Sequence, residues 1–308
     1  MNVSKSGSSK FLETLKRWRA KLSPIVGVAA VGLFLYWTFS YGETILSTFK
    51  ELGGVQLFFV VVLLVVAMLL EVYIFVILVQ DKKYTFSFAD GYHSLNLSHV
   101  AAMIPGGIWG YAGLAGMLWS KGISKLDSVL VIFFYTLISL TACAMVGFSG
   151  LFSIFGWGYS LIIFLPFIFA VVARNWMDQL RQKYYPESSQ LPSVSTLLKS
   201  LFLGMIVWVI VSFCFTWILN SSEGLKNIPF WIIFGAYAAG YLGGYITLLA
   251  PSGIGVSEGL ITLILGPYFG TSQVMSVAIS FRIIHSIVVW SNVLLTVILT
   301  SKQAGKND

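Results

Sequence analysis

The feature that most constrains this chain is a series of long apolar runs. A helix needs roughly 20 apolar residues to cross about 30 Å of hydrocarbon. The runs that reach or approach this length are residues 24–41, 55–79, 126–148, 159–173, 197–219, 229–250 and 271–299. Only 10% of the 308 residues are charged, whereas soluble domains average about 25%. The sequence therefore predicts an all-α, polytopic membrane helix bundle.

Basic residues are concentrated before the first apolar run. Six of the 19 basic side chains lie within the first 21 positions. In the same segment, Phe11, Leu15, Trp18 and Leu22 share one helical face. We expect residues 1–23 to form a basic amphipathic helix on the cytoplasmic membrane surface, with no removable signal peptide. The net charge of +7 then indicates contact with anionic lipid and no nucleic-acid partner.

The lysines and arginines of the short loops predict the orientation, because such residues are retained on the cytoplasmic side. With the N-terminus inside, the basic residues between the predicted spans that face the cytoplasm are Lys82, Lys83, Lys121, Lys125, Arg174, Arg181, Lys183 and Lys199. The opposite side receives only Lys50 and Lys226. This asymmetry requires that residues 88–121 do not cross the membrane. We expect an integral protein of the cytoplasmic membrane, with residues 24–300 as one bundle and 301–308 as a polar tail.

Two proline-glycine breaks interrupt the pattern of spans. The first is Pro105-Gly106-Gly107-Ile108 and the second is Pro251-Ser252-Gly253-Ile254. The helical piece after each break is about 20 Å long at 1.5 Å per residue, which reaches only part of the way across a bilayer. The sequence predicts seven or eight spans with two broken or re-entrant segments. The shared pattern has two interpretations, an internal repeat or two ordinary kinks.

A break followed by a half-helix leaves backbone N–H groups free inside the protein, and these groups with the helix dipole favour an anion. At the second break, Gly253 and Gly255 permit close approach of the backbone, and Ser257 is a candidate N-cap. We therefore place a substrate-binding site at both breaks, with Pro105, Gly106, Gly107 and Pro251 included. The alternative is a kink that only improves packing.

Charged residues inside apolar runs are the second group of candidates. Glu258 and Arg282 would each cost about 2.5–3.5 kcal/mol if they faced lipid at mid-bilayer. We expect them to face the interior and to pair, either as a fixed ion pair or as a station for a phosphate. His285 lies one turn after Arg282 on the same face. Glu71 in the second run is either functional or a satisfied polar contact.

No motif indicates catalysis, a metal or a cofactor. His93 and His99 are six positions apart, on different helical faces, and Cys143 and Cys214 each stand alone in an apolar run. We expect no metal site and no cofactor, and we expect the protein not to be an enzyme.

The stretch LAPSGIGVSE at 249–258, followed 24 residues later by Arg282, resembles the lysylphosphatidylglycerol synthase transmembrane-domain (flippase-like) family. The stretch IPGGIWGYAGLAGMLWSKGIS at 104–124 is similar to the first proline-glycine signature of that family. The resemblance covers most of the chain. It implies a polytopic protein that flips lipids, and it places Pro251, Gly253, Gly255, Glu258 and Arg282 on the motif positions. Because no soluble domain follows the last run, we expect no aminoacyl-lipid synthesis.

Three functions are consistent with the sequence. The first is binding and translocation of an anionic lipid or lipid-linked headgroup across the cytoplasmic membrane. The second is a membrane-embedded glycosyl or lipid transferase. The third is a non-transporting accessory subunit of a lipid-linked glycan pathway, which requires a partner enzyme.

Overall fold

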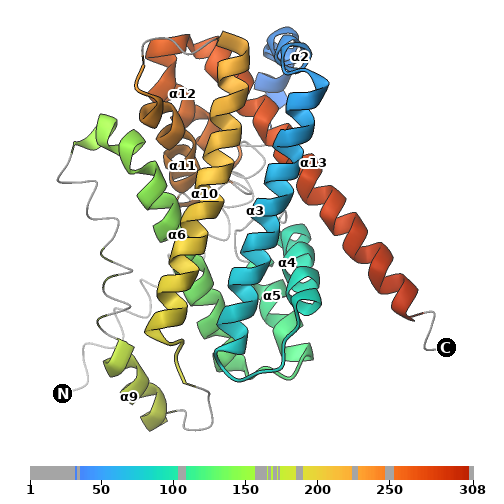
Figure 1. Ribbon diagram of the computed structural model, residues 1–308, viewed down its shortest axis with the longest axis vertical. Helices are drawn as coiled ribbons and strands as arrows, with labels where there is room; N and C mark the ends of the chain where they lie inside the picture. The colour runs from blue at the N-terminus through green and yellow to red at the C-terminus, as the bar shows by residue number, and fades with distance from the viewer. Residues whose placement is uncertain are drawn as a thin grey trace, which may run out of the picture.

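The computed structural model describes residues 35–102, 109–156, 174–184, 190–223, 228–246 and 253–304, with a few single positions besides. The predictions for residues 1–23, for most of 24–41 and 159–173, and for Pro105, Gly106, Gly107 and Pro251 lie outside these ranges. Every regular element within them is a helix (Figure 1). In chain order the helices are α2 (Gly42–Glu51), α3 (Gly54–Gln80), α4 (Phe88–Ala102), α5 (Trp109–Ser120), α6 (Lys125–Phe155), α9 (Arg174–Tyr184), α10 (Val194–Glu223), α11 (Phe230–Ile246), α12 (Val256–Phe269) and α13 (Thr271–Ala304).

Four of these helices, α3, α6, α10 and α13, are long and apolar enough to cross a membrane. Their ends lie within a few residues of the predicted runs 55–79, 126–148, 197–219 and 271–299, apart from extensions at the C-terminal ends of α6, α10 and α13. Large apolar side chains such as Val55, Phe58 and Phe202 are exposed on their outer faces. A helix that is apolar all round and exposed on one side fits a lipid environment. These helices indicate an integral membrane protein.

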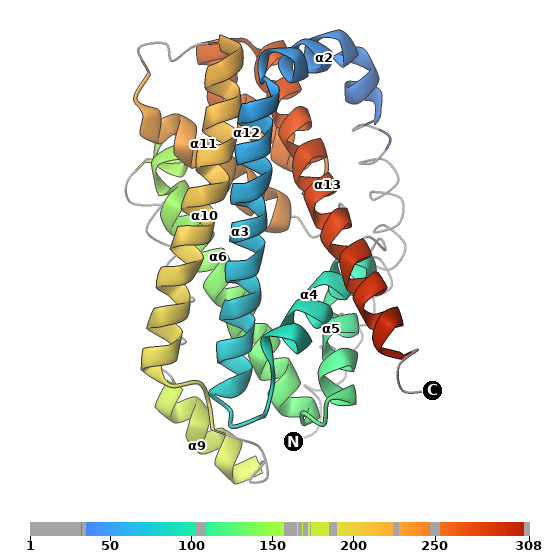
Figure 2. The same cartoon turned by 45° about the vertical axis from the view of Figure 1, so that its right-hand side comes forward.

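The helices α3 and α10 run side by side in opposite directions through the height of the molecule (Figures 1 and 2). Phe59 stacks on Trp217 with ring centroids 6.5 Å apart, and Phe215 contributes a fully buried ring to the same core. The short helix α2 lies across one end, where Ile45 packs against Met275 and Ile279 of α13. Gly53, with φ +62°, provides the sharp turn from α2 into α3.

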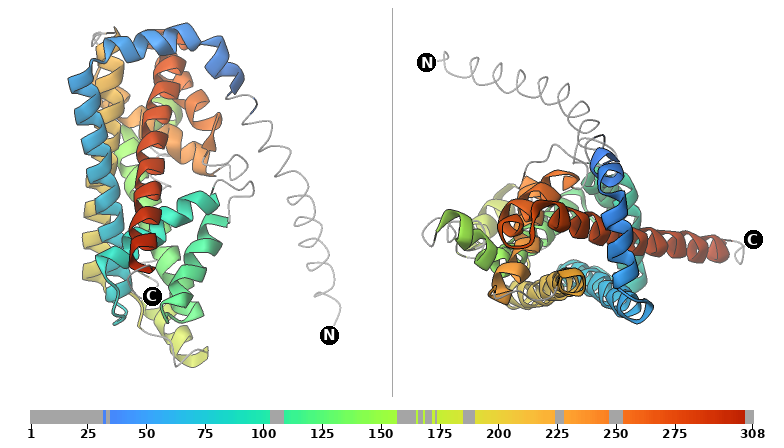
Figure 3. Two further views of the ribbon diagram at one scale, coloured as in Figure 1. Left: turned by 90° about the vertical axis from the view of Figure 1, so that its right-hand side faces the viewer. Right: turned by 90° about the horizontal axis from the view of Figure 1, so that it is seen from above.

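Two pairs of short helices fill the space beside the long ones. The pair α4/α5 occupies the half of the molecule near α9, and the pair α11/α12 occupies the opposite half (Figures 2 and 3). Asp90, near the start of α4, forms an ion pair with Lys121, just after the end of α5. The α4/α5 pair therefore begins and ends at the same end of the molecule. Gly122 and Gly270, with φ +80° and +91°, follow α5 and α12, at the positions where the sequence predicted each short helix to end.

Glycines allow the two helices of the second pair to pack closely. A Cβ atom on Gly240 would lie 2.9 Å from the carbonyl oxygen of Ser257 and 2.5 Å from Cγ1 of Ile261. Gly244 faces Gly253 and Ser257 in the same way. The predicted run 229–250 is described as the 17-residue helix α11, which is shorter than the long helices. Its partner α12 is also short, with 14 residues.

Candidate functional site

The ion pair of Glu258 and Arg282 joins the start of α12 to the middle of α13. Arg282 Nε donates to Glu258 Oε1, and the Glu258 side chain is only 2% exposed. The second carboxylate oxygen, Oε2, accepts the backbone N–H of Gly255 at 2.8 Å. The pairing expected from the sequence is therefore present. The same carboxylate also caps its own helix.

The turn before α12 depends on glycine. Gly253 and Gly255 have φ of +68° and +82°, and Gly255 is the N-cap residue. The expectation that Ser257 is the N-cap is wrong, because the helix already begins at Val256 and Glu258 supplies the capping oxygen. Ser257 instead donates its hydroxyl to the carbonyl oxygen of Gly253 at 3.1 Å. That bond stabilises the turn.

A cavity of about 230 Å³ lies at the centre of the described structure. Its wall combines residues from both pairs of short helices with residues from α3 and α6. The lining residues are Glu71, Leu95, Ser98, His99, Ala102, Gly110, Tyr111, Leu114, Tyr135, Thr136, Ser139, Leu140, Tyr241, Gly244, Tyr245 and Gly253. The hydroxyls of Tyr111 in α5 and Tyr245 in α11 contact each other, and both residues form part of the cavity wall. The inner ends of the two helix pairs therefore meet at this cavity.

The first break contributes to this cavity through its described neighbours. Ala102 ends α4 and Gly110 is the second residue of α5, and a Cβ atom on Gly110 would lie 2.9 Å from the Cβ of Ala102. The described ends of α4 and α5 therefore pack together, and both line the cavity with Gly253. That the two breaks form a substrate site stays a prediction.

His99 and His285 connect the cavity to the ion pair. His99 lies on the cavity wall, and the electrostatic neighbours of His285 are Arg282 and His99. The ring of His285 lies 6.4 Å from that of Phe281, one turn earlier on α13. Two imidazoles and the guanidinium of Arg282 therefore follow one another from the cavity to α13. Arg282 is the permanent cation of the three, and it is paired with Glu258.

Glu71 lines the same cavity from α3. It also borders a smaller space lined by Tyr135, Gly204 and Trp208. Within the described ranges it forms no hydrogen bond or ion pair. Both alternatives for Glu71, a functional acid and a satisfied polar contact, stay predictions.

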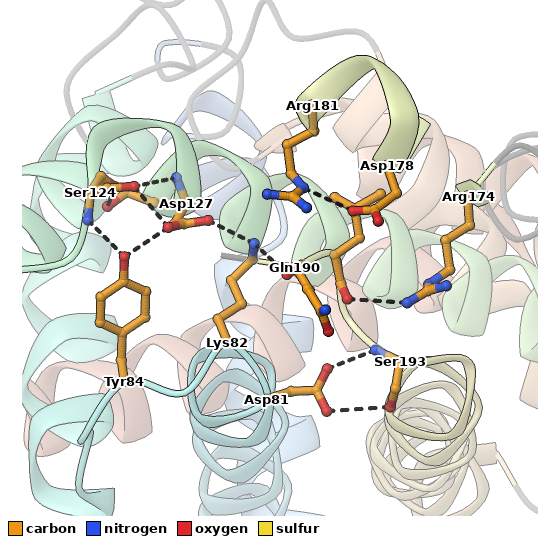
Figure 4. A network of polar contacts seen from close by, with 12 residues as sticks. Asp81, Lys82, Tyr84, Ser124, Asp127, Arg174, Asp178, Arg181, Gln190 and Ser193 are labelled. Carbon is orange, nitrogen blue, oxygen red and sulfur yellow. Dashed lines mark hydrogen bonds and ion pairs between the residues drawn. The ribbon is translucent and has the colours of Figure 1, made fainter. Parts of the chain in front are cut away.

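A second polar cluster, at the end of the molecule near α9, was not predicted from the sequence (Figure 4). Lys82 Nζ donates to Asp127 Oδ1 at 2.9 Å, and neither side chain has any exposed surface. Tyr84 donates to the other carboxylate oxygen of Asp127 at 2.7 Å, and Ser124 caps α6 by accepting the Asp127 N–H at 3.1 Å. Burial lowers the pKa of Lys82, and its hydrogen bond to Asp127 opposes that shift.

The cluster continues into α9 and α10. Asp81 accepts the backbone N–H of Ser193 at 2.7 Å, just before α10 begins. Arg181 donates to Asp178 at 2.8 Å, and this bond lowers the pKa of Asp178. Arg174 donates to the carbonyl oxygen of Pro192 at 2.8 Å. These contacts join α3, α6, α9 and α10 at one end of the bundle, which makes the cluster a structural clasp.

The tyrosines are the part of the cavity that the sequence reasoning missed. Tyr241 and Tyr245 are four residues apart in α11, and Tyr135 and Ser139 are four apart in α6, so each pair shares a helical face. That spacing was the available signal. Among the described residues, no group of three His, Cys, Asp or Glu side chains is placed to hold a metal ion.

The four long apolar helices indicate a helical integral membrane protein, and the two pairs of short helices meet at a cavity that carries several hydroxyl groups. No protein-family model matches the chain, and no curated protein matches it.

Proposed function

We propose that this protein binds an anionic lipid headgroup in the central cavity and moves it across the cytoplasmic membrane. The observation that carries the proposal is the meeting of two half-length helix pairs, from opposite ends of the molecule, at one polar cavity. Interrupted segments that meet near the middle of the membrane are typical of transporter substrate sites. The resemblance to the flippase-like family gives the same expectation.

The order of the elements supports this proposal. In the first half of the chain, α3 is followed by the α4/α5 pair and then by α6. In the second half, α10 is followed by the α11/α12 pair and then by α13, in the opposite direction (Figure 2). We propose that the halves are inverted repeats, each with two full crossings and one re-entrant pair within the described ranges. The seven or eight spans expected from the sequence stay a prediction.

Charge supports the same orientation that the sequence predicted. Lys82, Lys121, Lys125 and the basic residues of α9 all belong to the end that carries the clasp, whereas Lys50 lies in α2 at the opposite end (Figure 1). We propose that the clasp end faces the cytoplasm.

Arg282, near the cavity, contributes affinity for the headgroup. Arg282 forms a charge-assisted pair with Glu258, and a phosphate competes with that carboxylate for the guanidinium. A headgroup that leaves the cavity allows the ion pair to form again. The lipid tails stay outside the bundle, in contact with bilayer.

Reconstitution into phosphatidylcholine vesicles with fluorescent (NBD-labelled) phosphatidylglycerol tests this function. We expect wild type to move the probe between leaflets, as measured by dithionite quenching, and Glu258→Gln and Arg282→Gln to slow this at least tenfold. Lys50→Gln, which removes a charge far from the cavity, is the matched control and should behave as wild type. Equal rates in all four proteins would exclude the proposed role of the pair. Chemical modification of the headgroup by the purified protein would favour a transferase instead.

A further inference from the structure

Glu71 is the acidic residue of the described cavity wall, and it is placed without compensation. It lies in the second half of α3, a helix that is otherwise apolar from Gly54 to Val79 except for Gln56. Arg282 is paired with Glu258 and is not among the residues that line the cavity. No lysine or arginine lines the described cavity.

The groups that face Glu71 come from every element around the cavity. They are His99 of α4, Tyr111 of α5, Tyr135 of α6, and Tyr241 and Tyr245 of α11. The side of α10 that borders Glu71 contributes Gly204, Val207 and Trp208, which carry no charge. The wall therefore offers hydroxyls, which can hydrogen-bond to either form of a carboxyl group, and one imidazole.

An ionised carboxylate in such a place is costly, because it has lost water and has gained no cation. A proton removes the charge without requiring further ligands. The same reasoning applies with more force when an anion enters, since two negative charges in one cavity of this size repel each other strongly at low dielectric. Neutral Glu71 and a bound anionic headgroup are therefore mutually favourable.

We propose that Glu71 is a proton-binding site, and that its protonation accompanies entry of an anionic headgroup into the central cavity. This inference rests on the proposed function, and it adds the ion that moves with the headgroup. By reciprocity, the headgroup favours binding of the proton as much as the proton favours binding of the headgroup. Each headgroup then carries one proton through the cavity, and a proton gradient sets the direction of movement.

The test is the pH dependence of binding. Purified protein in phosphatidylcholine nanodiscs is titrated with dihexanoyl phosphatidylglycerol in sodium-free buffer, from mildly acidic to mildly alkaline pH. The readout is tryptophan fluorescence, since Trp208 packs on Tyr241 at the cavity with ring centroids 4.6 Å apart. For wild type we expect the affinity to fall about tenfold per pH unit once Glu71 is ionised. In Glu71→Gln the affinity should be independent of pH, and Glu71→Asp should restore a dependence.

Glu43→Gln is the matched control, because Glu43 is an exposed acid of α2 and must leave the wild-type pH dependence unchanged. A second measurement does not need the lipid. The infrared carbonyl band of a protonated carboxylic acid should titrate in wild type and be missing from Glu71→Gln.

The outcomes separate the two proposals. If wild type does not bind the probe at any pH while the infrared band of Glu71 titrates, the proposed function fails and the proton site stands. If wild type binds the probe with an affinity that does not change with pH, or if Glu71→Gln keeps the pH dependence, the proton site is excluded. A dependence on added sodium in place of pH would also overturn it.

Discussion

At the scale of single residues, the buried pair of Lys82 and Asp127 shows how charge is tolerated inside this protein. The pair has no exposed surface, and further hydrogen bonds from Tyr84 and Ser124 satisfy the carboxylate. Lys82 also donates to the carbonyl oxygen of Gln190 at 3.1 Å. Such a pair contributes little net stability over an apolar pair, but removing one partner leaves a buried charge.

We therefore expect Asp127→Leu to lower the free energy of unfolding by about 3–5 kcal/mol. Lys82 would then be buried without its carboxylate, and burial alone would lower its pKa further. Chemical denaturation in detergent measures the change. The double variant Lys82→Met/Asp127→Leu should recover most of the loss, and a double variant as unstable as Asp127→Leu would contradict this account.

Residue-level prediction from the sequence succeeded where a charge stood in an apolar run. Glu258 and Arg282 could be paired because lipid offers neither of them a partner. Lys82 and Asp127 stand in what the sequence presents as a loop and a helix start, where water is the default partner. Their burial depends on α9 and α10 closing over them, which no local pattern encodes.

At the scale of elements, α11 packs closely against α12 because Gly240, Gly243 and Gly244 have no side chains that would meet α12 or the turn before it. Small residues allow helix backbones to approach in membranes, where van der Waals packing drives association. The approach places Gly253 and the ion pair beside the cavity. The spacing of these glycines in the sequence does not show which helix packs on them.

Gly240→Val should separate α11 from α12, because its Cβ would lie 2.5 Å from Cγ1 of Ile261 and 2.9 Å from a backbone oxygen. We expect a loss of about 1–3 kcal/mol in stability, measured by thermal unfolding in detergent. Gly259→Ala is the matched control in α12, since nothing lies within 4 Å of its added Cβ. That variant should be unchanged or slightly more stable. Equal effects of the two substitutions would show that close packing is unimportant.

Helix limits were predicted well from the sequence, and helix contacts were predicted poorly. The short helical pieces predicted after the two breaks are α5 and α12. Proline and glycine mark such limits locally. The contact of Tyr111 with Tyr245 joins residues far apart in the chain, and helices that are apolar on all sides carry no pattern that predicts their neighbours.

At the scale of the whole molecule, the set from α3 to α6 and the set from α10 to α13 have the same order of long and short helices. The two sets run in opposite directions. Each set keeps its short pair at one end of the bundle, and the inner ends of the two pairs share the cavity. Opposed sets of this kind can rock against each other about a fixed site, so that the site opens to one side at a time.

Labelling of single cysteines tests this topology. In a background with Cys143 and Cys214 replaced by alanine, we expect Ser87→Cys and Lys121→Cys to react with an impermeant maleimide from the cytoplasmic side only. Pro229→Cys and Thr271→Cys should react from the opposite side only, because the proposed topology returns each pair of short helices to the side it entered from. Labelling of Ser87→Cys and Lys121→Cys from different sides would show that α4 and α5 cross the membrane.

The shared cavity also has a consequence for how the protein is made. Tyr111 is synthesised more than a hundred residues before Tyr245, so the α4/α5 pair must emerge from the ribosome long before α11 exists to cover its polar inner end. Until then, Ser98 and His99 have only water, lipid headgroups or a chaperone to face. A nascent chain stopped after α6 should therefore be a target for membrane quality control, even though its own helices are already long enough to insert.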